Sequence, residues 1–175
     1  VMMDLILEAV FTGLLSAEHL QIELTETAVA ENQDTLMANV NTLVDAGLSL
    51  AMDDFGTGYS SLDTLHHLPF SVVKIDQGVI KRLLESSRCA AITMASIRMA
   101  HEMGLTVVAE GVETEEVFDY LHHAGCTEAQ GYWLCRPKPI DGAIAFIQEG
   151  RSWCDFPIGL LRHIEMDHLQ WRKGI

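Results

Sequence analysis

Residues 48–58, LSLAMDDFGTG, decide the fold class of this chain. A short apolar run leads to two carboxylates, Asp53 and Asp54, and a glycine-containing turn follows them. Such a segment is typical of a buried parallel strand that delivers polar side chains at its carboxyl end. The residues before it, 35–45, place apolar side chains on one stripe of a predicted helix. A helix followed by a strand is therefore predicted here.

The same alternation of helix and strand recurs along the chain. We expect five strands, at residues 20–24, 48–52, 72–75, 106–109 and about 128–132. The predicted helices end near Gly47, Pro69, Gly104 and Gly125. A second amphipathic helix is predicted over 90–103, with Ile92, Ala95, Ile97 and Met99 on its buried stripe. This alternation predicts an α/β fold, a parallel sheet covered by helices.

The number of predicted strands is smaller than a closed barrel requires. An eight-stranded barrel with its helices takes about 250 residues, whereas this chain has 175 residues. We therefore expect an incomplete TIM-barrel-type fold with two free sheet edges. The rest of a parent protein, a symmetric partner or the chain's own tail would cover those edges. A homodimer or larger assembly is the expected state.

The net charge of the chain disfavours some classes of binding partner. Eleven basic and 25 acidic side chains give a formal net charge of −14, which disfavours a nucleic acid polymer or an anionic membrane as a partner. A phosphate ester would instead be reached through a divalent cation. The four cysteines form no CxxC pair, and the sequence has neither a signal-peptide pattern nor a long uncharged apolar run. We expect a reduced, cytoplasmic protein.

Polar side chains gather at the carboxyl ends of the predicted strands. The strands finish as IELTE, AMDDFGTG, KID, AEGVE and AQG. The candidate site residues at these ends are Glu23, Asp53, Asp54, Lys74, Glu110, Glu113 and Gln130. In parallel sheets and barrels this edge holds the functional site, because its loops vary while the sheet holds their roots. A site is therefore predicted there.

The adjacent residues Asp53 and Asp54 would point to opposite faces of a regular strand. Both reach one site if the strand ends between them and the segment 55–58 turns the chain. Two carboxylates that meet repel each other unless a cation lies between them, which predicts a hard divalent ion with Glu23 as a third oxygen ligand. A solvated turn with a helix cap is the alternative explanation of the same pattern.

Lys74 lies at the end of an otherwise apolar strand, VVKI. A lysine in such a position has a carboxylate partner or a catalytic role. A buried ion pair with Asp76 or Asp53 and a catalytic lysine are both consistent with the sequence.

The segments IELTE, DDFGTGYSSL, VVKID, VVAEGVE and AQGYWLCRP resemble, in order and spacing, the signature segments of the EAL domain family, over about residues 14–149. The resemblance implies a TIM-barrel-type fold. It also implies two-metal hydrolysis of cyclic di-GMP to linear pGpG, with Mg²⁺ or Mn²⁺ as the cofactor. On this basis we expect a partial EAL domain over 1–150 and a C-terminal helical tail over 151–175.

The resemblance implies a role for each candidate residue. Glu23 is similar to a metal ligand, Asp53 to the carboxylate that both metals share, and Asp54 to a ligand of the second metal. Lys74 is similar to the lysine that holds the attacking water and the phosphate. Glu110 is similar to the carboxylate that completes the shell of the second metal and its water network, and Gln130 to the glutamine that orients a nearby water molecule. Glu26 is similar to the glutamate that braces the loop 56–61. Glu113 is expected to support these residues from the second shell.

Two ligands of the family's first metal, in its Glu-Ala-Leu segment and at an asparagine one strand later, would precede Val1. The triplet Glu8-Ala9-Val10 lies in a predicted helix and is not expected to replace them. Two interpretations follow. The chain is a phosphodiesterase fragment completed by strands elsewhere, or it is an inactive EAL-like module that binds a partner or itself. The sequence alone leaves both open.

Overall fold

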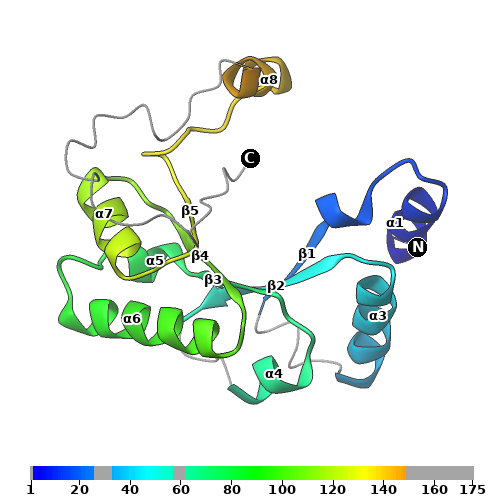
Figure 1. Cartoon of the computed structure of the whole chain (residues 1–175), viewed down its shortest axis with the longest axis horizontal. Helices are drawn as coiled ribbons and strands as arrows, with labels where there is room; N and C mark the ends of the chain where they lie inside the picture. Colours follow the sequence, from blue (N-terminus) through cyan, green and yellow to red (C-terminus); the bar gives the residue numbers. More distant parts are fainter. Residues whose placement is uncertain (1, 26–32, 57–61, 149–175) are drawn as a thin grey trace.

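The computed structural model describes residues 2–25, 33–56 and 62–148 of the chain. Within these ranges, five parallel strands form one sheet in the order β1-β2-β3-β4-β5 (Figure 1). The strands are β1 (Gln21–Thr25), β2 (Ser49–Phe55), β3 (Val72–Ile75), β4 (Thr106–Glu110) and β5 (Glu128–Gln130). The predicted α/β class and all five predicted strands are confirmed, with ends that differ by at most three residues.

Helices connect these strands. They are α1 (Met2–Phe11), the 3-10 helix η1 (Ala17–His19), α3 (Gln33–Asp45), α4 (Leu62–His67), α5 (Gln77–Ile80), α6 (Ser87–Glu102), α7 (Glu115–His123) and α8 (Ile140–Gln148). Spatial order follows sequence order, which is the arrangement of a sheet built from successive right-handed strand–helix units. The predicted C-terminal helical tail, 151–175, lies outside the described residues.

Glycines and a proline follow the helix ends as expected. Gly47, Gly104 and Gly125 come after α3, α6 and α7, and each has a positive φ. This left-handed conformation ends a helix at little steric cost only when the residue is glycine. The triplet Glu8-Ala9-Val10 lies in α1, as predicted.

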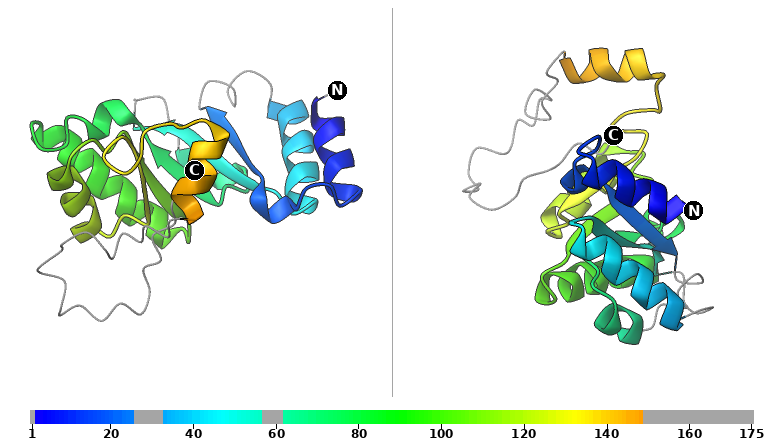
Figure 2. Two further views of the ribbon diagram at one scale, coloured as in Figure 1. Left: turned by 90° about the horizontal axis from the view of Figure 1, so that it is seen from above. Right: turned by 90° about the vertical axis from the view of Figure 1, so that its right-hand side faces the viewer.

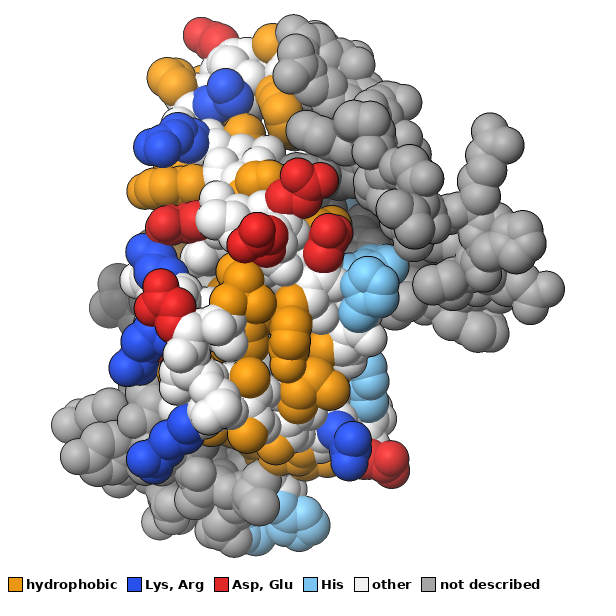
Figure 3. Space-filling view, turned by 90° about the vertical axis from the view of Figure 1, so that its left-hand side faces the viewer, with side chains coloured by type: hydrophobic (Ala, Val, Ile, Leu, Met, Phe, Trp, Pro, Cys, Tyr) orange, Lys and Arg blue, Asp and Glu red, His pale blue; other side chains and the backbone are white. Residues whose placement is uncertain are grey.

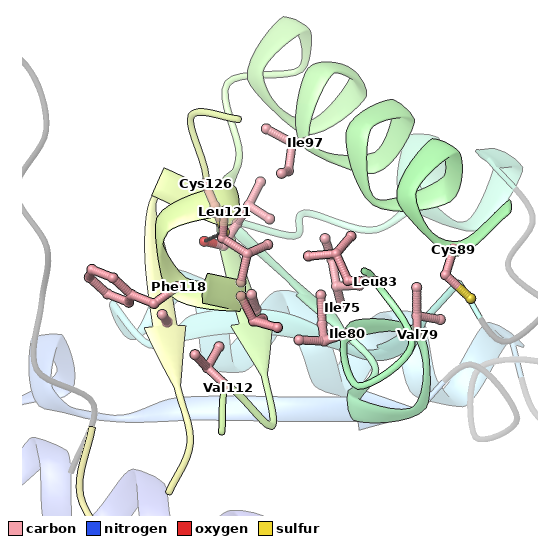
Figure 4. Close-up of a cluster of buried hydrophobic side chains, with 14 of the residues drawn as sticks. Ile75, Val79, Ile80, Leu83, Cys89, Ile97, Val112, Phe118, Leu121 and Cys126 are labelled. Atoms are coloured by element: carbon pink, nitrogen blue, oxygen red, sulfur yellow. Dashed lines mark hydrogen bonds between the residues drawn. The ribbon is translucent and has the colours of Figure 1, made fainter. Parts of the chain in front are cut away.

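Helices cover one face of the sheet, and Figure 1 shows α3, α4 and α6 together on that side, with α8 set apart from it. The right-hand view of Figure 2 also shows α8 apart from the sheet, beyond the segment that follows β5. The largest buried cluster fills the space between β3–β5 and α5–α7 (Figure 4). Fully buried Ile75, Leu121 and Val112 belong to it. This cluster fixes the roots of the loops that leave the carboxyl ends of β3, β4 and β5.

The buried stripe of α6 differs from the predicted one. Ile97 is buried, but Ala95 is exposed, and Ile92 and Met99 are only partly buried. The buried positions are Cys89, Thr93, Ser96, Ile97 and Ala100. Ser96 can be buried here because its Oγ donates a hydrogen bond to the Ile92 carbonyl at 2.8 Å.

The opposite face of the sheet carries small apolar residues in the middle of the strands and charged residues toward their carboxyl ends. Ala51, Val72 and Val108 form a separate small buried cluster on this face. Two residues further along each strand, the same face carries Asp53, Lys74 and Glu110. The alternation of the strands therefore places the predicted polar residues on the face that the helices do not cover.

An open groove of about 460 Å³ lies on the outer surface between α6 and α7. Its lining residues are Leu84, Met94, Glu116, Asp119, Tyr120, His123 and Ala124. Figure 3 shows hydrophobic side chains gathered on this side of the molecule, with acidic side chains beside them. The groove contains none of the sequence-predicted site residues, so the candidate site is located at the strand ends instead. Among the described residues, no helix is long and apolar enough to cross a membrane.

Candidate active site

The ammonium of Lys74 lies among carboxylates from three other strands. Lys74 Nζ is 2.8 Å from Glu23 Oε1, 2.7 Å from Glu110 Oε1 and 3.5 Å from Asp53 Oδ1. We call these four residues the Lys74 centre. They come from β1, β2, β3 and β4, so the arrangement depends on the whole tertiary fold and not on one local motif. The prediction that Glu23, Asp53, Lys74 and Glu110 meet at one edge is confirmed.

The register of the strands explains why these side chains meet. Thr25 pairs with Asp53, and Lys74 pairs with Val108, two residues before Glu110. Side chains two residues apart on a strand share a face, and neighbouring strands lie about 4.8 Å apart. The long lysine side chain in β3 can therefore reach the carboxylates on either side of it.

Lys74 is buried, so its charge depends on the carboxylates that it contacts. Its side chain is 8% exposed, whereas that of Glu23 is 46% exposed. Burial by itself lowers the pKa of the ammonium, but hydrogen bonds to Glu110 and Glu23, with the charges of Glu110 and Asp53, raise that pKa above its usual range. Lys74 is therefore held as a cation. The alternative of an ion pair with Asp76 is wrong, because Asp76 Oδ1 accepts instead from Gly78 N at 2.8 Å and caps α5.

Two carboxylates at this edge have pKa values above their usual range. Burial raises the pKa of Glu110, and the charges of Asp53 and Glu23 add to this effect while Lys74 opposes it. Burial also raises the pKa of Asp54, together with the charges of Asp53 and Asp76. The carboxylates at this edge thus carry more negative charge than the single lysine balances.

The expected strand end between Asp53 and Asp54 is wrong, because β2 continues to Phe55. The pairing of β2 with β3 is instead irregular between Met52 and Phe55, and Asp54 has a φ of 59°. This local bulge in the left-handed region, which Asp adopts more readily than most residues, redirects the chain at the pair. Asp54 is exposed there, and its charge interacts with those of Asp53 and Lys74.

The remaining predicted residues are placed differently from the Lys74 centre. Gln130 ends β5 in register with Glu110 and has an exposed side chain. Glu113 forms an ion pair with Lys81 at 2.9 Å instead of contacting the Lys74 centre. Sequence reasoning did not identify Lys81, since nothing in its local pattern marks it. Glu26 and residues 57–61 of the loop that it would brace lie outside the described residues.

The donor atoms suit a hard divalent cation. All the acidic groups of the Lys74 centre offer carboxylate oxygens, which Mg²⁺ and Mn²⁺ prefer. Asp53 Oδ1 is buried and accepts no hydrogen bond in the described part of the chain, so it has coordination capacity to spare. Across residues 2–25, 33–56 and 62–148, no three His, Cys, Asp or Glu side chains converge on one metal position. In this geometry the Lys74 ammonium is the cation that the carboxylates surround.

Solved structures share this fold. The phosphodiesterase MucR, in a complex with c-di-GMP, matches with a TM-score of 0.75 and 38% identity, covering 80% of this chain and 57% of that one. The EAL domain of Mycobacterium smegmatis DcpA matches with a TM-score of 0.79 and 33% identity, over 86% of this chain and 67% of that one. Klebsiella pneumoniae BlrP1, in a manganese and c-di-GMP complex, matches with a TM-score of 0.71 and 34% identity, covering 77% of this chain and 34% of that one. These matches confirm the prediction that the fold is of the TIM-barrel type.

The chain belongs to the EAL domain family, whose profile matches residues 1–137. The bifunctional diguanylate cyclase/cyclic di-GMP phosphodiesterase MucR of Pseudomonas aeruginosa is 38% identical over 146 residues, which is 83% of this chain and 21% of that protein. The cyclic di-GMP phosphodiesterase NbdA of the same organism is 40% identical over 137 residues, 78% of this chain and 18% of that protein. The chain thus spans about a fifth of the length of these relatives.

Proposed function

We propose that this chain supplies the Lys74-centred part of the active site of a cyclic di-GMP phosphodiesterase, which hydrolyses cyclic di-GMP to linear pGpG. The observation that carries the proposal is the convergence of Glu23, Asp53 and Glu110 on Lys74 at the carboxyl ends of four strands. Relatives that are named for this activity, and solved relatives with the dinucleotide bound, support it.

Glu23, Asp53, Asp54 and Glu110 are the residues that would hold Mg²⁺ or Mn²⁺. Their oxygen atoms support this assignment, as does Asp53 Oδ1, which accepts no hydrogen bond from the described residues. When bound, the metal pair supplies Lewis acidity and lowers the pKa of a bound water molecule. A solved relative with manganese and another form of it with calcium support a divalent ion.

The protein's own groups contribute charge and orientation. Lys74, which stays protonated, donates hydrogen bonds to a phosphodiester oxygen and to the attacking water. Glu110 orients Lys74 through its 2.7 Å contact and accepts a hydrogen bond from the attacking water. Gln130, exposed at the end of β5 beside Glu110, orients a water molecule with its amide. Glu113 supports the loop after Glu110 through Lys81.

Further features of the proposal concern the whole protein. Residues 1–150 form the EAL part of the chain, 151–175 a helical tail, and Glu26 braces the loop 56–61. The protein works as a homodimer or larger assembly, which the position of β1 at the edge of the described sheet and the exposed side chains of Leu5, Phe11 and Leu14 support. It acts in the bacterial cytoplasm, which the free cysteines at 89, 126 and 135 support.

A turnover assay tests the proposal. The purified chain is incubated with cyclic di-GMP and Mn²⁺ or Mg²⁺, and pGpG is measured by chromatography. We expect Lys74→Ala to lower the rate at least about 100-fold, the usual scale for a group that acts in the transition state. Arg98→Ala, which removes an exposed charge from α6, should leave the rate unchanged.

Two outcomes of the turnover assay would contradict the proposal. If the wild-type chain forms no pGpG but binds cyclic di-GMP, the hydrolytic proposal is wrong and the chain is a dinucleotide-binding module. Equal rates for the wild type and Lys74→Ala would show that the Lys74 centre is not the reaction site.

A further inference from the structure

The open groove between α6 and α7 combines apolar side chains with unpaired acidic ones. Leu84, Met94 and Tyr120 give it apolar surface, and Leu84 is 49% exposed. Glu116 and Asp119 add two exposed carboxylates, which we call the groove carboxylates. Neither has a lysine or arginine partner in the part of the chain that the structure describes. The groove therefore fits an occupant that offers both apolar and cationic side chains.

The walls of this groove are held by the main core. Ile97 of α6 and Leu121 of α7 are buried in that core, and Tyr120 packs against it. The first turn of α7 is also fixed, because the Thr114 hydroxyl accepts a hydrogen bond from Val117 N at 3.3 Å. The groove is thus formed before anything occupies it, so that binding mainly orders the occupant.

The end of the chain has the chemistry that the groove fits. Residues 169–175, LQWRKGI, combine apolar Leu169 and Trp171 with the cations Arg172 and Lys173, and they include no acidic residue. The whole formal net charge of −14 lies in residues 1–148, because the basic and acidic side chains of 149–175 balance each other. Tryptophan and arginine are also the residues that most often dominate the binding energy of an interface.

The length of the intervening chain allows this segment to reach the groove. Residues 149–175 lie outside the described part of the chain, and about 20 residues separate Gln148, the end of α8, from Leu169. An extended chain of that length spans up to about 65 Å, whereas a compact domain of roughly 150 residues is about 40 Å across. Attachment to the same molecule also gives the segment a high effective concentration at the groove.

We propose that residues 169–175 dock in the groove between α6 and α7 of the same molecule. Trp171 packs against the apolar side chains of the groove, and the two cations of the segment pair with the groove carboxylates. Docking covers apolar surface that is otherwise exposed. The groove contains none of the residues of the Lys74 centre, so the docked segment leaves the proposed reaction site open. The inference is independent of the proposed function.

Oxidation of methionine by hydrogen peroxide in the full chain tests the docking. Met94 lies in the groove, and Met103, which is 41% exposed and outside the groove, serves as the internal reference. Peptide mass spectrometry gives the ratio of the oxidation rates of Met94 and Met103. Trp171→Ser should raise this ratio at least about threefold, because the loss of a central aromatic anchor uncovers Met94 and oxidation follows exposure.

A charge exchange tests the ionic pairing. The double variant Arg172→Glu/Lys173→Glu should raise the ratio as Trp171→Ser does, since it sets like charges against each other. Adding Glu116→Lys and Asp119→Lys to that variant restores opposite charges and should return the ratio to the wild-type value. Arg162→Glu reverses a charge outside the docking segment and should leave the ratio unchanged.

The other outcomes overturn the docking. Equal ratios in the wild type, Trp171→Ser and the double variant, with circular dichroism showing folded proteins, would show that the segment does not occupy the groove. A ratio that stays high after the charges are exchanged would contradict pairing with the groove carboxylates. A ratio that falls as the protein concentration rises would show that a second copy occupies the groove. Formation of pGpG is measured separately, and its absence would contradict the proposed function without affecting the docking.

Discussion

Strands β1 and β3 belong to the same parallel sheet, yet their environments differ. Every residue of β3 is buried, whereas the residues of β1 alternate between exposed and half-buried. Lys74 comes from the buried strand, and its partner Glu23 comes from the exposed edge strand. The Lys74 centre therefore joins a rigid part of the molecule to a part with fewer packing contacts. We expect the rigid part to set stability and the edge strand to tolerate change.

The largest contrast is expected from truncating one apolar side chain in each strand. Ile75→Ala in β3 removes a fully buried side chain and should lower the free energy of unfolding by about 3–4 kcal/mol. Ile22→Ala in β1 removes a half-buried one and should cost about 1 kcal/mol. Urea denaturation of both variants measures the difference. Similar losses in the two variants would contradict the contrast between the strands.

The next effect concerns Lys74 itself. Lys74→Met leaves buried negative charge without its cation and should cost about 3 kcal/mol at pH 8. Because the folded-state pKa of Lys74 is raised, its stabilisation is fully present at neutral pH and is lost only at strongly basic pH.

The pH dependence of that variant sharpens the test. The pKa of Glu110 is already raised and rises further without Lys74, so its ionised form destabilises the folded state. Protonation of Glu110 as the pH falls should therefore recover part of the lost stability at pH 5. Urea denaturation at pH 5 and pH 8 checks this, and a larger loss at pH 5 would contradict the electrostatic account.

A pair of glycine variants tests how tightly the loops after β4 and β5 are held. Gly131→Ala places a methyl group on the backbone of Val112 and should cost about 3 kcal/mol or shift the loop. Gly104→Ala has open space around it and meets only the strain of its positive φ, about 1 kcal/mol. Thermal unfolding compares the two. Equal costs would show that the contact between the loops is not tight.

The smallest effect is expected at the ion pair between Lys81 and Glu113. Both side chains are nearly half exposed, so Glu113→Gln should change the free energy of unfolding by less than about 1 kcal/mol. Its matched comparison is Glu110→Gln, which breaks the contact to the buried Lys74 and should cost more. Chemical denaturation in low salt measures both. A larger loss for Glu113→Gln would show that the ion pair between Lys81 and Glu113 stabilises the fold more than the contact between Lys74 and Glu110 does.

Much of the fold could be predicted from local pattern alone. The strand at 72–75 is apolar except for Lys74, and the glycines after α3, α6 and α7 mark helix ends that the structure confirms. The stripe of α6 was predicted less well, because Thr93 and Ser96 are polar in type but buried in fact. Hydrophobicity patterns do not register that the Ser96 hydroxyl donates to a carbonyl of its own helix, or that the Thr93 hydroxyl is buried without a hydrogen-bond partner among the described residues.

The site was predictable in position but not in detail. Alternation along the strands places Glu23, Lys74 and Glu110 at one edge, and the structure confirms their convergence. The bulge at Asp54 depends on one left-handed residue, which sequence pattern does not specify. The pairing of Glu113 with Lys81 depends on how two loops approach each other in space. The chemical roles of these residues came from family resemblance and remain predictions.

Metal binding tests the central claim most directly, because the carboxylates of Glu23, Asp53, Asp54 and Glu110 are proposed to hold a divalent cation. Mn²⁺ is titrated into the full chain and free Mn²⁺ is followed by electron paramagnetic resonance, with Asp53→Asn and Arg98→Ala measured in parallel. The account predicts saturable binding that Asp53→Asn weakens at least about tenfold and Arg98→Ala leaves unchanged. Binding of equal strength in the wild type and Asp53→Asn, or no saturable binding in the wild type, would contradict it.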